Sequence, residues 1–307
     1  MPVRVGVIGV GYLGQHHARI YSDIEGVELA AIADIDENKA YSLAEKFGCK
    51  TYSDYRKILP MVDAISIVTP TTSHYNIALE CLKAGKDILV EKPLTDNIRD
   101  ADKLVAESEK NGCILQVGHI ERYNPTFIKG SEIINEPEFI EAERISPFYG
   151  RGTDVDVTLD LMIHDADIVL SIINRQTIKE IRATGIKIVT DKIDVAKAWI
   201  EFDNGCVAVL KASRFSQDKK RMLRVYQKGT FITIDFQNNE IHHYRKTYEG
   251  LYSDIIKPDN KEPLREELID FIHCVKERMR PKVSAVEARN ALKIVLDITD
   301  IIKKREG

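Results

Sequence analysis

Short apolar runs alternate with helical segments over the first 119 residues of the chain. The apolar runs are residues 3–9, 27–34, 63–70, 86–93 and 113–118. Between them, segments such as 36–48 and 71–85 place apolar residues three and four positions apart and end in glycine, as helices commonly do. Repeated strand, helix and strand is typical of a parallel sheet with helices on both faces. The alternation therefore predicts a doubly wound α/β domain over residues 1–119.

The pattern changes after this point. The remaining helical segments are residues 157–173, 263–279 and 284–304. Most of the chain between them alternates polar and apolar residues. Asn204 and Gly205 separate two alternating segments, and an Asn-Gly pair favours a two-residue hairpin turn. We therefore expect residues 120–307 to form a second domain with a mostly antiparallel sheet.

Charge and cysteine spacing argue against several classes of protein. The 307 residues carry a net charge of −4, which does not favour binding to nucleic acid or to an anionic membrane. Residues 211–228 contain seven basic residues, which are interpreted as a solvated face of a strand pair. The five cysteines are never spaced as CxxC, which favours reduced thiols over disulfides or zinc. The pattern of the first residues and the lack of an apolar run of about 18 residues lead us to expect neither a leader nor a membrane span. We expect a cytoplasmic protein that binds no metal, nucleic acid or membrane.

A glycine-rich turn follows the first apolar run. Gly9, Gly11 and Gly14 form GxGxxG, and Tyr12 and Leu13 lie inside the motif. In dinucleotide-binding folds the first glycine makes a tight turn, the second lets backbone amides approach the pyrophosphate, and the third lets the helix pack on the strand. On the motif alone, a plain glycine-rich turn is an equal alternative.

Asp34 supports the nucleotide interpretation. It ends the second apolar run, 20 residues after Gly14. A carboxylate there accepts hydrogen bonds from both ribose hydroxyls of NAD and repels the 2′-phosphate of NADP. The alternative is that Asp34 or Asp36 caps the next helix. We expect Asp34 to bind the ribose, Asp36 to be the cap, and NAD to be preferred.

Two clusters suggest chemistry beyond cofactor binding. Glu91, Lys92 and Pro93 end a strand at the sheet edge where ligands bind, and the lysine there could stabilise an alkoxide or donate a proton, unless it is a solvated turn residue. Asp160 and His164 are four residues apart, which places them on one helix face. Histidine suits a general base for alcohol oxidation, and a structural His–Asp contact is the alternative.

The order of these motifs resembles one family. GxGxxG is followed by TPTTSH (69–74), EKP (91–93) and the Asp160 and His164 pair, and this series resembles the Gfo/Idh/MocA oxidoreductases in both halves of the chain. The resemblance implies a Rossmann domain joined to an α/β domain with a large open antiparallel sheet, often used for oligomerisation. It implies an NAD-dependent sugar dehydrogenase in which His164 takes the hydroxyl proton, Lys92 stabilises the oxyanion, and Asp160 orients substrate and lysine.

A narrower resemblance concerns the substrate. Residues 117–127 and 152–167 resemble the branch of this family that oxidises the 3-hydroxyl of UDP-N-acetylglucosamine to a ketone, to which a partner aminotransferase then adds nitrogen. A free sugar or an inositol as substrate, or a non-catalytic NAD-binding regulator, is the alternative. Asn124 and Pro125 are interpreted as a helix cap and first helical residue. Arg122 is a candidate for the substrate diphosphate, since guanidinium groups suit phosphate oxygens.

The resemblance and the motifs together define the predicted site. The predicted cofactor-binding residues are Gly9, Gly11, Tyr12, Leu13, Gly14, Asp34, Thr69, Pro70, His74, Glu91 and Lys92. The predicted substrate-binding residues are Lys92, Arg122, Tyr149, Arg151, Asp160 and His164, of which Lys92, Asp160 and His164 are catalytic. Arg144 is a further candidate for the diphosphate; for all the arginines and Tyr149, surface or interdomain pairing is the alternative. His74 either lies near the nicotinamide or caps the following helix. We expect residues 1–119 to bind NAD, residues 120–307 to bind substrate and to oligomerise, and the assembly to be a homodimer or homotetramer.

Overall fold

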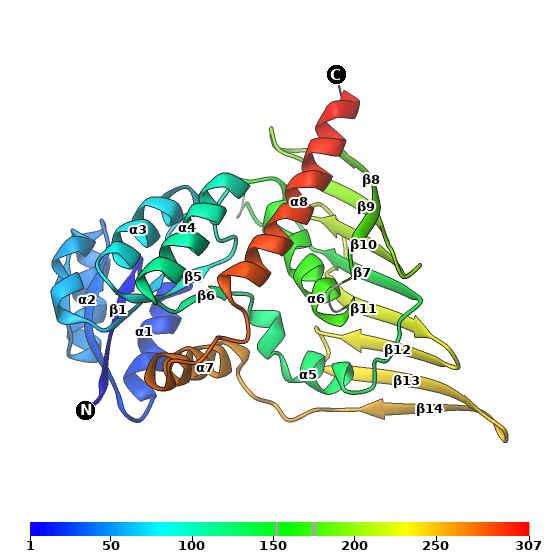
Figure 1. Ribbon diagram of the computed structural model, residues 1–307, viewed down its shortest axis with the longest axis horizontal. Coiled ribbons are helices and arrows are strands. Elements are labelled where there is room, and N and C mark those ends of the chain that lie inside the picture. Colours follow the sequence, from blue (N-terminus) through cyan, green and yellow to red (C-terminus); the bar gives the residue numbers. More distant parts are fainter. Residues whose placement is uncertain (151–152, 174–175, 307) are drawn as a thin grey trace. The chain divides into compact units, whose positions relative to one another are not determined.

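The computed structural model describes residues 1–150, 153–173 and 176–306, and its contacts divide the chain into two compact units (Figure 1). The first unit consists of Met1–Ile120 and Glu262–Arg289; the second consists of Glu121–Lys261 and the chain from Asn290 on. The predicted second domain, residues 120–307, differs from the second unit because the segment Glu262–Arg289 groups with the first. The functions assigned to the two domains stay predictions.

Six parallel strands form the sheet of the first unit, in the order β3-β2-β1-β4-β5-β6. They are β1 (Val3–Ile8), β2 (Val27–Ala33), β3 (Lys50–Tyr52), β4 (Ala64–Ile67), β5 (Asp87–Glu91) and β6 (Leu115–Gly118). The helices are α1 (Gly14–Asp23), α2 (Glu37–Phe47), α3 (Thr71–Lys83), α4 (Ile98–Asn111) and α7 (Pro263–Glu277), with short turns η1 (Tyr55–Lys57) and η2 (Leu59–Met61). The order reverses between β1 and β4, the point at which open α/β sheets bind ligands. The predicted doubly wound Rossmann sheet is confirmed.

Helix α7 comes from the far end of the chain yet belongs to this unit. Its apolar residues Leu268 and Phe271 are fully buried in one core cluster with Val5, Val7 and Ala18 of β1 and α1. An apolar helical stripe identifies a helix that must be covered, but not the surface that covers it. The predicted boundary placed this segment in the second domain, whereas α7 packs in the core of the first unit.

Eight strands form the sheet of the second unit, in the order β14-β13-β12-β11-β7-β10-β9-β8. They are β7 (Phe139–Ile145), β8 (Ile178–Ile186), β9 (Val195–Phe202), β10 (Val207–Ser213), β11 (Lys220–Gln227), β12 (Thr230–Asp235), β13 (Glu240–Thr247) and β14 (Gly250–Ile256). All neighbours are antiparallel except β7 and β10. The Asn204 and Gly205 turn joins β9 to β10, with Gly205 at φ +84°. The large, mostly antiparallel sheet is thus confirmed.

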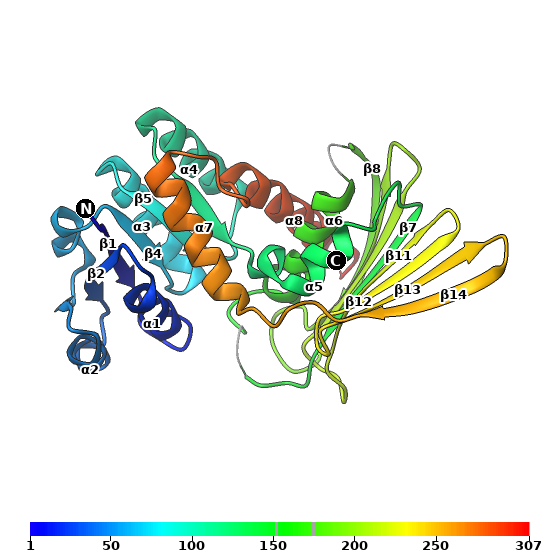
Figure 2. The ribbon, with the colours of Figure 1, turned by 90° about the horizontal axis from the view of Figure 1, so that it is seen from below.

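Helices cover one face of this sheet (Figure 2). The helical elements are the turn η3 (Ile120–Tyr123) at the unit boundary, α5 (Pro125–Ser131), the π-helical turn η4 (Thr158–Met162), α6 (Ile163–Ile173) and α8 (Ala285–Glu306). Of these, α6 lies against β7 and β10, and α5 against β12 and β13. Along β9, Ala196, Ala198 and Ile200 are buried while Lys197 and Trp199 are exposed. No described helix covers the second face (Figure 2), which carries the row Trp199, Phe139, Tyr226, Phe231 and Tyr244.

Two predicted helix starts are confirmed. Asp36 caps α2 by accepting a hydrogen bond from the Lys39 N–H at 3.2 Å. Asn124 caps α5 by accepting one from the Thr126 N–H at 2.9 Å, and Pro125 is the first helical residue. Both caps satisfy backbone donors that a helix start leaves open.

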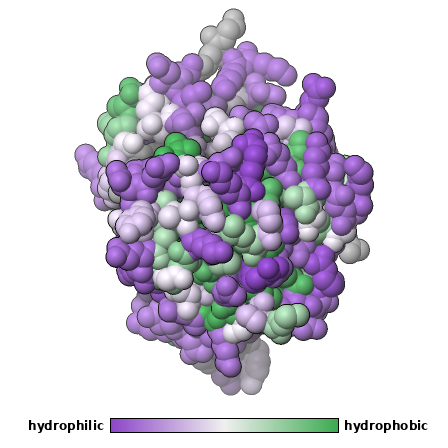
Figure 3. Space-filling model, turned by 90° about the vertical axis from the view of Figure 1, so that its left-hand side faces the viewer, coloured by the Kyte–Doolittle hydropathy of each residue, from purple (hydrophilic) through white to green (hydrophobic). Residues whose placement is uncertain are grey.

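The surface view in Figure 3 is mostly hydrophilic, with apolar residues scattered among polar ones. The exposed sides of amphipathic helices produce such a face. Within the described part of the chain, every helix is too short or too polar to span a bilayer.

Candidate active site

Gly9 and Gly14 are required by the turn itself. Gly9 has φ +86°, and a Cβ built there would collide with the backbone oxygen of Val68. A Cβ on Gly14 would collide with the backbone oxygen of Gly9. A side chain at either position would therefore force the loop between β1 and α1 to open.

Gly11 has no such requirement. No described atom lies within 4 Å of the position that a Gly11 Cβ would take, and its φ is not positive. The space beside Gly11 is therefore open on the ligand side, as the close approach of a pyrophosphate needs. Tyr12 beside it is exposed, whereas Leu13 packs against the core. These residues fit a dinucleotide at the start of α1.

Asp34 lies next to this loop, immediately after β2. One carboxylate oxygen accepts a hydrogen bond from the Val10 N–H at 2.6 Å and the other accepts one from the Asp36 N–H at 2.9 Å. The carboxylate is thereby held against the glycine turn, and it keeps lone pairs for two ribose hydroxyls. Since Asp36 is the cap of α2, the alternative that Asp34 caps the helix does not hold.

His74 joins two turns at the carboxyl edge of the sheet. Its Nε2 lies 2.8 Å from the Thr69 carbonyl oxygen and its Nδ1 lies 2.9 Å from that of Pro93. Only the imidazolium can donate to both carbonyls, yet burial lowers the pKa of His74, against the effect of these two hydrogen bonds. The ring thus fixes the turn at Thr69 and Pro70 relative to the turn after β5. Contact of His74 with the nicotinamide stays a prediction.

Glu91 and Lys92 end β5 with different surroundings. The Glu91 carboxylate is buried, with Oε1 3.2 Å from Nε2 of His17 in α1. A Cβ on Gly118 would lie 2.8 Å from Glu91 Oε2, so the glycine leaves room for this carboxylate. Glu91 therefore points into the first unit, beneath the turn that carries half-buried Lys92.

Asp160 and His164 lie where the π-helical turn η4 runs into α6. Both side chains are half-buried, while Met162 and Ile163 between them are buried. The two residues therefore share one partly accessible stripe, as their spacing predicts. A π-helical turn inside a helix is uncommon and occurs frequently at functional sites.

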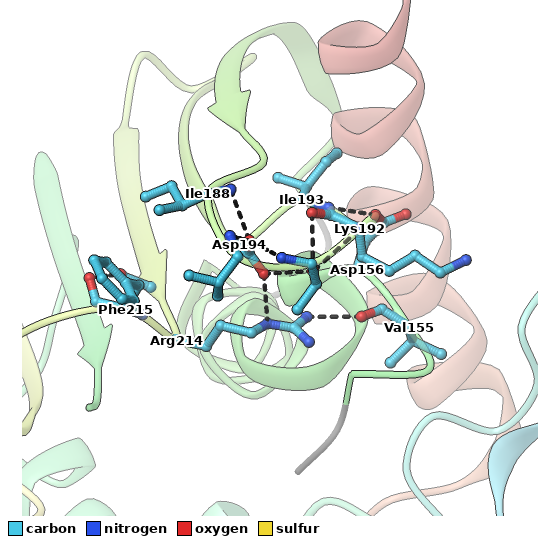
Figure 4. Close-up of polar contacts among 11 residues, drawn as sticks. Val155, Asp156, Ile188, Lys192, Ile193, Asp194, Arg214 and Phe215 are labelled. Atoms are coloured by element: carbon cyan, nitrogen blue, oxygen red, sulfur yellow. Dashed lines mark hydrogen bonds and ion pairs between the residues drawn. The ribbon is translucent and has the colours of Figure 1, made fainter. Parts of the chain in front are cut away.

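The chain just before η4 is held by buried charges (Figure 4). Asp194 accepts hydrogen bonds from the backbone N–H groups of Ile188, Val189 and Thr190 at 2.7, 2.8 and 3.0 Å. Burial works in the opposite direction, but these bonds and the Thr190 hydroxyl lower the pKa of Asp194 to about 2. Arg214 lies 3.8 Å from Asp194 and donates to the Val155 carbonyl at 2.7 Å.

Asp156 and Thr158 continue this anchoring. Asp156 accepts from the Ile193 N–H and from Lys303 of α8, both at 2.8 Å. The Thr158 hydroxyl lies 2.6 Å from that of Thr299 in α8. The turn that carries Asp160 is therefore fixed on two sides within the second unit.

Arg144 has a structural role. Its guanidinium donates to Glu121 at 2.8 Å and to one oxygen of Asp165 at 2.9 and 3.1 Å, and all three side chains are buried. Burial raises the pKa of Asp165, whereas Glu121, although buried as well, has its pKa lowered by the Arg144 cation. Arg144 joins β7 to α6 and η3, which favours the alternative of pairing within the protein over the candidate role at a diphosphate.

The other predicted substrate residues differ in exposure. Arg122 lies 3.5 Å from Asp167 with a side chain that is 14% exposed. Tyr149 is exposed. Arg151 lies outside the described residues. Lys92 belongs to the first unit and Asp160 and His164 to the second, so the predicted site has two parts, each assembled in its own unit.

Comparisons with known proteins identify the family. Residues 3–119 match the family model of the Gfo/Idh/MocA proteins, described as an oxidoreductase family with an NAD-binding Rossmann fold. Over 304 residues, which cover 96% of this chain and 96% of the relative, the sequence is 34% identical to UDP-N-acetylglucosamine 3-dehydrogenase of Acidithiobacillus ferrooxidans. The chain belongs to the Gfo/Idh/MocA family. As a member, it is an NAD-binding oxidoreductase, which confirms the predicted family, cofactor and enzyme class.

Other members agree in sequence and fold. The structure of the Acidithiobacillus ferrooxidans enzyme, GnnA, superposes with a TM-score of 0.92 at 33% identity and 99% coverage of both chains. Myo-inositol 2-dehydrogenase of Thermotoga maritima is 28% identical over 94% of this chain and 93% of the relative. The family thus includes dehydrogenases of a nucleotide sugar and of a cyclitol.

The position of Arg221 was missed in the sequence. Arg221 lies in the basic stretch interpreted as a solvated face, yet its strand position is opposite Arg144, on the face that α6 covers. Strand alternation could have placed Arg221 on that face, once β11 was aligned with β7.

Among residues 1–150, 153–173 and 176–306, no cluster of three or more His, Cys, Asp or Glu side chains could hold a metal ion. The expected absence of a metal stays a prediction.

Proposed function

We propose that this Gfo/Idh/MocA protein oxidises the 3-hydroxyl of UDP-N-acetylglucosamine to a ketone. The observation that carries the proposal is the 34% identity to a UDP-N-acetylglucosamine 3-dehydrogenase along almost the whole of both chains. The half-buried Asp160 and His164 on one helical stripe support it, because both side chains remain accessible to a substrate.

The residues of the first unit would hold the cofactor. The open space at Gly11 suits the pyrophosphate, and the Asp34 carboxylate suits the adenosine ribose. When bound, NAD accepts the two electrons and the hydrogen removed from the sugar carbon. Lys92 and the turns bridged by His74 follow strands at the same carboxyl edge.

The residues of both units would act on the hydroxyl group. In this proposal His164 takes the hydroxyl proton as the carbon is oxidised. The Lys92 ammonium stabilises the negative charge that develops on the oxygen, and Asp160 orients the substrate and Lys92. The buried contacts of Asp156, Thr158 and Asp194 would keep Asp160 in position.

The test is the absorbance of NADH when the purified protein and NAD meet UDP-N-acetylglucosamine, its galacto epimer or myo-inositol. Each reaction is run with and without 2-oxoglutarate, which would reoxidise NADH if the enzyme recycles it in place. Reduction of NAD with UDP-N-acetylglucosamine supports the proposal. Reduction of NAD with myo-inositol alone would show that the substrate is a cyclitol and not the UDP-sugar. Tight binding of NAD without reduction of NAD by any of the three compounds would favour a non-catalytic regulator.

We also propose that the uncovered face of the eight-stranded sheet joins copies of this chain. Its row of aromatic side chains, with Trp199 38% exposed, supports this proposal. Sedimentation equilibrium of the purified protein would give a dimer or tetramer, whereas a monomer at micromolar concentration would contradict it.

A further inference from the structure

Arg221 on β11 lies directly opposite a second arginine on the neighbouring strand β7. It is the direct cross-strand neighbour of Arg144 on β7, so both side chains leave the sheet on the same face. Arg144 bonds to Asp165 of α6, the residue that follows His164. Arg221 therefore lies on the sheet face that the helix of the proposed catalytic pair covers.

The two arginines differ in how their donors are used. The Arg144 guanidinium is buried between Glu121 and Asp165. Arg221 is exposed, and no described residue lies within hydrogen-bond or ion-pair distance of its guanidinium. An arginine presents five N–H donors in a planar fork, and those of Arg221 face solvent or a ligand.

Arg221 has charged neighbours of both signs. The protein around the inner part of this exposed side chain and, next, the Arg144 cation lower the pKa of Arg221, whereas Glu121 and Asp165 act to raise it. Glu121 and Asp165 both bond to Arg144, so an anion bound at the Arg221 guanidinium would be its direct partner.

We propose that the guanidinium of Arg221 binds the diphosphate of the nucleotide-sugar substrate. The planar fork can donate two parallel hydrogen bonds to phosphate oxygens, which a lysine cannot do. This inference rests on the proposed function, because it requires a substrate that carries a diphosphate.

Binding of UDP to the full-length protein, measured by calorimetry, tests the proposal without any turnover. Arg221→Ala should raise the Kd for UDP about 10- to 100-fold, the usual effect of losing hydrogen bonds to a charged group. Arg221→Lys should lie between the wild type and Arg221→Ala. The matched control is Arg245→Ala, since Arg245 is an exposed arginine of the same sheet that pairs with Asp254 at 2.8 Å. Its Kd should stay within about twofold of wild type.

Steady-state kinetics supply a second readout. Arg221→Ala should raise KM for the UDP-sugar while changing kcat and the KM for NAD much less, because uniform binding is lost and the chemistry is not. If Arg221→Ala fails to fold, Arg221→Lys decides, since it keeps the charge and loses the fork. Unchanged UDP binding in a folded variant, with a wild type that binds UDP, would overturn this inference alone. A wild type that neither binds UDP nor oxidises the UDP-sugar would overturn the proposed function as well.

Discussion

Gly11 and Gly14 belong to one motif, but Gly14 is required by the packing of the turn and Gly11 by the space left for a ligand. A Cβ at Gly14 meets the Gly9 oxygen, whereas a Cβ at Gly11 meets no described atom. Gly14→Ala should therefore lower the free energy of unfolding by roughly 3 kcal/mol. Gly11→Ala should change it by less than about 0.5 kcal/mol and yet weaken NAD binding, because the methyl group enters the space of the pyrophosphate. Urea unfolding and NAD titration separate the two effects; equal NAD affinity in Gly11→Ala would contradict this assignment.

Asp34 and Asp36 form a second matched pair. Asp34→Ala should weaken NAD binding about 10- to 100-fold while NADP binding changes less, since a charged acceptor for the ribose is lost and so is its repulsion of a 2′-phosphate. Asp36→Ala removes the cap of α2 and should cost about 1 kcal/mol of stability. Its ratio of NAD to NADP affinity should be that of the wild type. Titration of both variants with both cofactors gives the ratio, and a parallel shift in the two variants would refute the distinction.

The catalytic assignment has its own test. His164→Ala and Lys92→Ala should retain NAD affinity and lose about 100-fold or more in kcat, because a general base and a positioned cation contribute in this range. Stopped-flow measurement of a single turnover distinguishes a slow chemical step from slow product release. Wild-type turnover in His164→Ala would remove its role as the base.

Single residues could be predicted from sequence where the determining neighbour is close in the chain. The caps at Asp36 and Asn124 are of this kind, since each accepts from an N–H two or three residues away. Arg144 could not be assigned in this way. Its partners Glu121 and Asp165 lie 23 and 21 residues distant, and only the packing of η3 and α6 on β7 brings them to it.

At the scale of elements, the anchoring of η4 carries a pH dependence. The pKa of Asp194 lies below its ordinary value of 3.8, at about 2, so its ionised form stabilises the fold. This stability is complete above pH 4 and is lost as the pH falls through about 2, a loss of about 2 kcal/mol. Asp194→Asn should be less stable than the wild type at pH 7, and the difference should shrink between pH 4 and pH 2. Urea unfolding across this range measures it, and a constant difference would contradict the role of the charge.

Regular elements were predictable because their patterns are local. The strands of the first unit and the hairpin at Asn204 and Gly205 follow from apolar runs and turn residues. The π-helical start of the helix at 157–173 could not be predicted, because its extra residue per turn depends on how Thr158 and its neighbours are held.

At the scale of the whole molecule, α7 makes the first unit discontinuous in sequence. Residues 1–120 alone should fail to unfold cooperatively, because Leu268 and Phe271 are missing from their core. Joining 262–289 to residue 120 through a glycine-serine linker should restore a cooperative thermal transition. Calorimetry of both fragments decides, and a sharp transition in the shorter fragment would show that α7 is dispensable.

The same discontinuity has a consequence for synthesis on the ribosome. All six strands of the first sheet have been translated by Gly118, but α7 is made only after the whole of Glu121–Lys261. Until then the apolar surface of α1 that α7 covers has no partner from its own unit. A nascent chain buries what it can as it emerges, and exposed apolar surface attracts chaperones or other chains. The six strands of the first unit are thus translated first, but the core of this unit is completed only after Glu121–Lys261 and α7 have been made.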